Sequence, residues 1–164
     1  MIPVTILTSK KLSDLLTTGN ALAEEITALA TANNLNIPSI TPAQVVLSSA
    51  TPDMGDRNIQ LMYPRICLYS SNIRNSQFEK FRSLSGTASV TADVWASANL
   101  VSDVDTWIHF YVEAMTGILR QNIGDWGDGV FFSGLYDAQF QPPKAGGIGF
   151  VQSAKVSCSV NVSR

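Results

Sequence analysis

The chain has 164 residues, of which 45% are hydrophobic and only 15% are charged, and its formal net charge is −2 at pH 7. A disordered chain would show the reverse balance, and this length supplies one sizeable core, so we expect a single domain over residues 1–164. The 11 basic residues are spread thinly. This argues against sequence-specific DNA binding, because affinity for the phosphate backbone needs clustered lysine and arginine.

The sequence contains no apolar run of the roughly 18 residues that a membrane-spanning helix needs, so we expect no membrane insertion. The apolar start Ile2–Leu7 precedes its nearest basic residues, Lys10 and Lys11, which is the reverse of the order in a secretory signal peptide. Cys67 and Cys158 fall in strand-like segments. We expect both to be buried, reduced thiols in a protein made and used in a reducing cytoplasm.

The first helix is predicted from Leu12 to Asn34, where apolar residues recur at helical spacing. Alternatively, Gly19 breaks this helix and Asn20 caps its second part. Residues 35–58 contain three prolines and a glycine and predict a long extended connection, with one short extended piece at Val45–Ser48. Connections of this length are often binding segments.

The middle of the chain predicts two strands joined by a polar segment. An extended run from Ile59 to Ser70 is interrupted by Pro64, which belongs at a sheet edge or a bulge because proline cannot donate to a ladder. The segment Asn72–Ser85 is polar and basic and is expected to be a loop. From Thr87 to Ala96, small apolar residues alternate with other residues, which is typical of a strand.

The clearest helix is predicted from Ser102, as the N-cap, to about Ile123. A glycine-rich turn, Gly124–Gly129, separates it from a strand at Val130–Phe140, and a loop at Gln141–Gly147 follows. The last strand, Ile148–Val162, alternates so regularly that we expect one of its faces on the core and the other in water.

The predicted order of helix, strand, strand, helix, strand, strand indicates an α+β fold. We expect a two-layer sandwich in which an antiparallel or mixed sheet carries both main helices on one face. Trp107, Tyr111, Met115, Val156 and Val160 are the predicted core residues.

The residues with catalytic chemistry do not form a recognisable site. His109, the only histidine, lies between Asp105 and Glu113 at helical spacing, as on a solvated helix face. Asp125 and Asp128 suggest a calcium loop, but no glutamate follows at the required spacing, so a turn is favoured. Two isolated cysteines do not supply a zinc site. We therefore expect no enzymatic activity, no metal and no cofactor.

Two polar loops are the candidate contact surfaces of this chain. The segment around Asn72–Ser85 combines basic and aromatic side chains that suit an acidic neighbour, although a solvated loop explains them equally well. The second loop joins the last two predicted strands. The candidate residues for contact with another subunit or partner are Arg74, Phe78, Lys80, Phe81, Arg82, Pro142, Pro143 and Lys144.

Several of these segments together resemble a known family. A first helix and a long connection lead into Tyr63–Tyr69 (YPRICLY) and a hairpin, then the helix Asp103–Ile123, then Gly134–Asp137 (GLYD) and the long alternating strand. From about Ile59 onward this order is similar to the tail terminator and tail completion subunits of long-tailed bacteriophages.

That resemblance implies a structural virion protein that forms a hexameric ring, caps the tail tube, halts its growth and joins the tail to the head. The implied partners are copies of itself, the tail tube protein, the head–tail connector or neck proteins, and DNA that passes without sequence recognition. Assembly would take place in the host cytoplasm. Two alternatives remain: another neck or tail component, such as an adaptor, stopper or tube subunit, and a small-molecule-binding domain.

Overall fold

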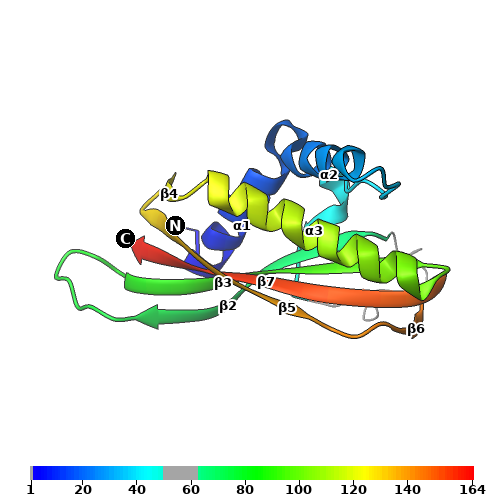
Figure 1. The fold of residues 1–164 in the computed structure, drawn as a ribbon. Coiled ribbons are helices and arrows are strands. Elements are labelled where there is room, and N and C mark those ends of the chain that lie inside the picture. The colour runs from blue at the N-terminus through cyan, green and yellow to red at the C-terminus, as the bar shows by residue number, and fades with distance from the viewer. Residues whose placement is uncertain (1, 50–62) are drawn as a thin grey trace.

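A computed structural model describes residues 2–49 and 63–164 and shows an α+β fold, as the sequence predicts. Helices gather on one side of a curled sheet, and a long hairpin projects from one end of that sheet (Figure 1). The sheet is mixed, because its short first strand runs parallel to the second while the other pairings are antiparallel.

The described residues contain three α-helices and seven strands. The helices are α1 (Val4–Thr17), α2 (Ala21–Ala32) and α3 (Val101–Gln121), with short 3-10 turns at Thr18–Asn20 and Pro42–Gln44. The sheet runs in the order β1-β2-β3-β7-β5-β4, and β6 pairs separately with the start of β7. The strands are β1 (Val45–Leu47), β2 (Arg65–Asn75), β3 (Ser85–Ala98), β4 (Gly124–Gly127), β5 (Val130–Phe140), β6 (Lys144–Gly146) and β7 (Gly149–Ser163).

The centre of the sheet is the antiparallel pair β3 and β7, which runs from Ser85 opposite Ser163 to Ala98 opposite Phe150 without a register shift. Side chains alternate across a strand, so the even-numbered residues of both strands share one face. From Ala88 to Ala98 in β3, and from Ala154 to Val162 in β7, these even-numbered residues are buried in the core.

The helices cover that face at two depths. Helix α1 packs on β2 and β3, and α3 packs on β3 and β7, whereas α2 packs mainly on α3 and rests above the sheet (Figure 1). The Tyr111 hydroxyl in α3 donates to the Pro38 carbonyl oxygen at 2.7 Å, which ties α3 to the segment after α2. Tyr111, Met115, Val156 and Val160 are buried as predicted, and Trp107 is half-buried against the core.

The single helix predicted from Leu12 to Asn34 is wrong, and the alternative with a break at Gly19 is confirmed. Gly19 and Asn20 have φ values of 62° and 57°, a left-handed turn that ends one helix before the next begins. Asn20 occupies the N-cap position of α2, but its side chain makes no capping hydrogen bond. Helix α1 also begins earlier than predicted, at Val4, because buried Leu7 extends its apolar face.

The short piece predicted at Val45–Ser48 appears as β1, and Val130–Phe140 is confirmed as β5. The segment Asn72–Ser85 is not entirely loop: β2 continues to Asn75, since these residues pair with β3 as far as Gly86. Residues 59–62 of the predicted run from Ile59 lie outside the described residues. The predicted turn at 124–129 and the predicted loop at 141–147 contain the short strands β4 and β6.

The long helix and the last strand are the longest described elements of their kinds, but their starts differ from the prediction. Helix α3 begins at Val101 with Leu100 at the N-cap, so Ser102 is not the cap, and β7 begins at Gly149. The expected water-facing side of β7 is also only partly exposed: Val151 and Ser153 are buried. Strand β6 pairs beside the start of β7, and the turn at Gly146 and Gly147 lies against the Val151 side chain.

Both cysteines are free and buried, as predicted. Cys67 lies opposite Asp93 and Cys158 opposite Val90, so the two side chains point to opposite faces of the sheet. Burial raises the pKa of both thiols, that of Cys158 to about 12, which makes reactive thiolates scarce at neutral pH. Within the part of the chain that is described, no helix combines the length and the hydropathy needed to cross a membrane.

We predict that Val156→Asp abolishes cooperative folding. Val156 is 2% exposed, and a carboxylate there would be buried without a partner, at a cost of more than about 4 kcal/mol. Asn161→Asp, on the exposed face of the same strand, is the matched control and should melt like the wild type. Thermal melting followed by circular dichroism tests both, and a cooperative melt of the Val156 variant would contradict the register.

Candidate assembly surfaces

The first candidate surface is the tip of the β2–β3 hairpin, residues 76–84, which we call the hairpin tip. The two strands of this hairpin pair as far as Asn75 and Gly86. Figure 1 shows that the hairpin extends beyond the helices at one end of the sheet. The tip is therefore presented to other molecules.

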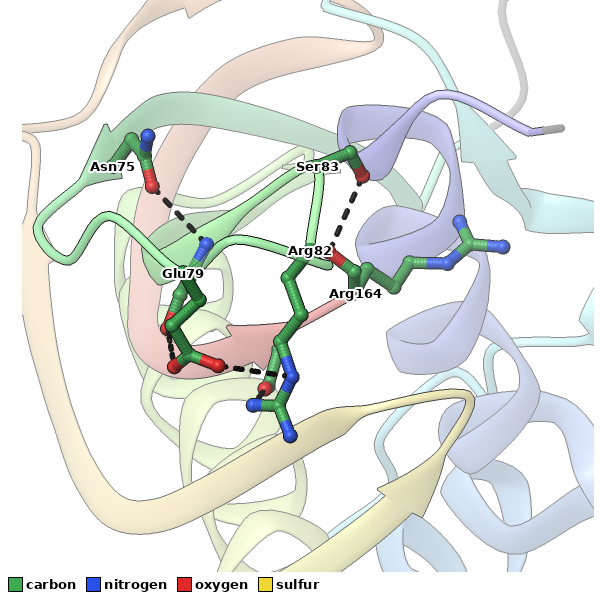
Figure 2. Close-up of polar contacts among 7 residues, drawn as sticks. Asn75, Glu79, Arg82, Ser83 and Arg164 are labelled. Carbon is green, nitrogen blue, oxygen red and sulfur yellow. Dashed lines mark hydrogen bonds and ion pairs between the residues drawn. The ribbon is translucent and has the colours of Figure 1, made fainter.

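A carboxylate organises the hairpin tip from inside (Figure 2). One oxygen of Glu79 accepts from the Ser85 hydroxyl at 2.8 Å, and its other oxygen lies 3.1 Å from Nε of Arg82. The Asn75 side-chain oxygen accepts from the Ser85 backbone N–H at 3.1 Å. These contacts close the loop on itself, so the tip has a defined conformation.

The tip is also fastened to the end of β7. Leu84 and Arg164 exchange two backbone hydrogen bonds, of 2.9 and 2.8 Å. The Ser83 hydroxyl donates to the Arg164 carbonyl oxygen, and the Arg82 guanidinium donates to the Ser163 hydroxyl (Figure 2). The position of the tip relative to the sheet is therefore fixed by a strand that is distant in sequence.

Gly86 makes the base of the hairpin possible. A Cβ atom at this position would lie 1.9 Å from the Arg74 carbonyl oxygen, closer than any real contact. Only glycine lets the two strands approach this closely at the base of the hairpin tip. The predicted loop Asn72–Ser85 stops before Gly86, and no sequence pattern indicated this close approach.

Phe78 and Phe81 are the outward-facing residues of this ordered loop. Their side chains are 95% and 92% exposed, the largest values among the exposed large hydrophobic residues of the described chain. Lys80 lies between them in the sequence, and its ammonium is 5.9 Å from the centre of the Phe81 ring. Two exposed aromatic rings on one loop make the hairpin tip a candidate protein-binding surface.

The basic residues of this region have different roles. Arg82 forms the internal ion pair with Glu79, so it shapes the tip. Arg74 is exposed near the end of β2, and Lys80 is exposed on the tip itself. Lys80, the third basic residue predicted to meet an acidic partner, has its ammonium 5.9 Å from the centre of the exposed Phe81 ring.

The second predicted group, Pro142, Pro143 and Lys144, lies at the opposite end of the sheet. Lys144 pairs with Val151 at the start of β7, whereas the hairpin tip adjoins the end of β7 (Figure 1). These residues border a pocket of about 500 Å³ on the helix-free face, together with Asp93 and Trp95. The structure therefore separates the two groups of candidate residues into two surfaces.

The Asp93 carboxyl group is the one acidic group in the lining of this pocket, which also contains Lys144 and Lys155. It is 4% exposed, and burial raises its pKa above the ordinary value of 3.8, an effect that the ammonium of Lys155 partly offsets. Lys155 is its cross-strand partner in the β3–β7 register. The Lys144 ammonium lies 5.4 Å from the centre of the Trp95 ring, so a cation and an aromatic ring frame the pocket.

The outer edge of β5 is a third surface, which the sequence analysis missed. Strand β4 pairs with β5 only as far as Phe132, and beyond it this edge faces no strand that the structure describes. Leu135 is 72% exposed and Phe140 is 42% exposed along it. An open edge with apolar side chains can pair with another chain. The sequence signal that could have revealed this edge is the presence of aromatic residues on both faces of the predicted strand.

The residues considered for metal or acid–base chemistry are engaged elsewhere. Asp128 forms an ion pair with Lys11 at 2.7 Å, which lowers the pKa of its carboxyl group, and Asp125 accepts from the Gly127 N–H. The His109 ring stacks on Phe140, with centroids 4.5 Å apart. Among residues 2–49 and 63–164, no three histidine, cysteine, aspartate or glutamate side chains are grouped to hold a metal.

No protein-family model matches this sequence, and no curated protein is similar to it.

We predict that Asp93→Asn changes how stability depends on pH. Because the folded-state pKa is raised, the wild type loses stability as pH rises from about 3.8 through that pKa, whereas the asparagine variant does not. The melting temperature of the variant, relative to the wild type, should increase between about pH 4 and pH 8. Thermal melts across this range test it, and a constant difference would contradict the assignment.

Proposed function

We propose that this chain is a structural virion protein, a tail terminator subunit that assembles into a hexameric ring. The ring would cap the tail tube, halt its growth and join the tail to the head. The observation that carries this proposal is the ordered hairpin tip with two phenylalanines in water. The order of elements that resembles tail terminator subunits supplies the biological setting.

A ring needs two different surfaces on each subunit, because its contacts run head to tail and close by rotation. The hairpin tip and the surface around Pro142–Lys144 lie at opposite ends of the sheet, and the β5 edge lies on a separate flank. This separation supports a subunit that contacts one neighbour with the tip and other partners elsewhere. The low charge content, 15%, suits a surface largely covered by partners.

The remaining partners follow from the position of such a ring. One side of the ring would meet the tail tube protein, and the other would meet head–tail connector or neck proteins. DNA would pass through the centre, which a net charge of −2 and thinly spread basic residues allow without tight binding. The working location would be the virion, at the junction of tail and neck.

A different neck or tail component is the second candidate, since an adaptor, stopper or tube subunit would also display exposed aromatic residues. Electron microscopy of the purified protein separates them. A terminator forms closed rings of uniform mass, whereas a tube subunit forms filaments. Particles that lack a terminator should carry tails of uncontrolled length that do not attach to heads.

We predict that Phe78→Ser combined with Phe81→Ser prevents ring assembly without lowering stability. Both side chains are more than nine-tenths exposed within the chain, so their loss removes almost no internal packing. Burial of aromatic anchors carries much of the affinity of an interface, so self-association should weaken ~30-fold or more. Light scattering against concentration gives the association, and a thermal melt gives the stability.

Gln77→Ser, another exposed position in the same tip, serves as the control and should assemble normally. A wild-type chain that stays monomeric at every concentration, together with normal tails when its gene is deleted, would refute the proposed function.

A further inference from the structure

An open groove on the helical side of the molecule has no occupant among the described residues. It has a volume of about 850 Å³ and lies along α2, next to the turn at Thr41 and Pro42. Ala28 and Ala32 line it and are exposed, and Glu24 is the only charged residue in its lining. An apolar groove of this size accommodates large side chains.

The threonine side chains of α2 in this groove have hydroxyl groups that are already hydrogen-bonded within the helix. The hydroxyl of Thr27 donates to the Ala23 carbonyl oxygen, and that of Thr31 donates to the Thr27 carbonyl oxygen, both at 2.8 Å. Since their donors are already satisfied within α2, covering these side chains leaves no unpaired hydroxyl proton. The groove can therefore receive an aromatic ring without a large desolvation cost.

The hairpin tip has the complementary chemistry. It presents Phe78 and Phe81 with Lys80 between them, and the groove presents small side chains with one acid, Glu24. Lys80 and Glu24 are both exposed, and neither forms a salt bridge among the described residues. The two aromatic rings and the cation of the tip therefore match, in chemical character, the apolar walls and the single carboxylate of the groove.

The tip cannot fill the groove of its own chain. It projects from one end of the sheet, whereas α2 lies above α3 and away from that end (Figure 1). It is also tied to β7 by the backbone hydrogen bonds between Leu84 and Arg164. The occupant must therefore come from another molecule, and a head-to-tail contact between identical chains brings together two such different patches.

We infer that the hairpin tip of one copy of this chain inserts Phe78 and Phe81 into the α2 groove of the next copy, with Lys80 facing Glu24. This inference rests on the proposed ring function and deepens it by naming the two surfaces of the subunit contact. Because Glu79, Arg82 and Ser85 already hold the tip in one conformation, little conformational freedom is lost on insertion.

Cysteine cross-linking between two variants of the full chain tests the contact directly. Phe78→Cys places a thiol on the tip, and Thr27→Cys places one in the groove, while Cys67 and Cys158 remain buried. Mixing the two variants under mild oxidation should give a disulfide-linked dimer that neither gives alone. Asp103→Cys, exposed on the first turn of α3, replaces Thr27→Cys in the control mixture and should not cross-link.

A charge exchange tests the same contact without new thiols. Lys80→Glu and Glu24→Lys should each weaken self-association about two- to fivefold, as expected for an exposed ion pair, and more strongly at low salt. The double variant should restore wild-type association, because the pair is rebuilt with reversed signs. Sedimentation velocity at two salt concentrations measures all four proteins.

The outcomes separate this inference from the proposed function. A specific dimer together with restored association in the double variant supports the inference. Normal rings that give no cross-link, or a tip variant that assembles normally but fails to attach to tails or heads, would overturn the inference and leave the ring intact. A wild-type chain that never self-associates would overturn both.

Discussion

The fourteen-residue antiparallel pairing of β3 with β7 is the interaction on which the rest of this structure depends. Its unbroken register places the even-numbered residues of both strands on the helix side, and those from Ala88 to Ala98 and from Ala154 to Val162 are buried there. A shift of β7 by one residue would move Val156 and Val160 to the other face. The same pairing carries β2 on one side and β5 on the other, so it also determines where both edges of the sheet lie.

That pairing also determines the geometry of the surfaces. Because β7 ends beside the base of the β2–β3 hairpin, Ser163 and Arg164 can hold the tip, and Glu79 then orders it from within. Because β7 begins at the other end of the sheet, β6 pairs with it there and the turn at Gly146 and Gly147 lies against Val151. The length of one strand therefore separates the tip from the Pro142–Lys144 surface.

The distinctive side chains of the described chain are exposed apolar ones. Apolar side chains are exposed to water on three surfaces, which marks these surfaces as candidates for contact with other proteins. They are Phe78 and Phe81 on the tip, Leu135 on the β5 edge and the alanines of the α2 groove. Their distribution over several sides suits a subunit with several neighbours. Our proposed ring uses this distribution, with a rigid aromatic tip on one side of the subunit and an apolar groove on the other.

The sequence by itself determined the α+β class, the strands at Val130–Phe140 and near Thr87–Ala96, and most of the core of α3 and β7. These features follow from local periodicity, which has the same meaning wherever the element lies in the fold. The sequence also identified Phe78, Lys80 and Phe81 as candidate contact residues, because aromatic side chains are conspicuous in a polar segment. The break at Gly19 remained one of two alternatives, since a single glycine either interrupts or merely weakens a helix.

Only the tertiary structure decided which surfaces these residues form. The demand for glycine at position 86 and the fastening of the tip to Arg164 depend on segments that are distant in sequence. The ion pair of Arg82 with Glu79 depends on how the loop between β2 and β3 folds. The β5 edge is open because no described strand pairs with its outer side beyond Phe132, and the α2 groove is open because no described segment packs over it. A local sequence pattern does not encode either fact. Burial of Asp93 and Val151 on the helix-free face was likewise unpredictable, because alternation along a strand shows that its faces differ but not what covers them.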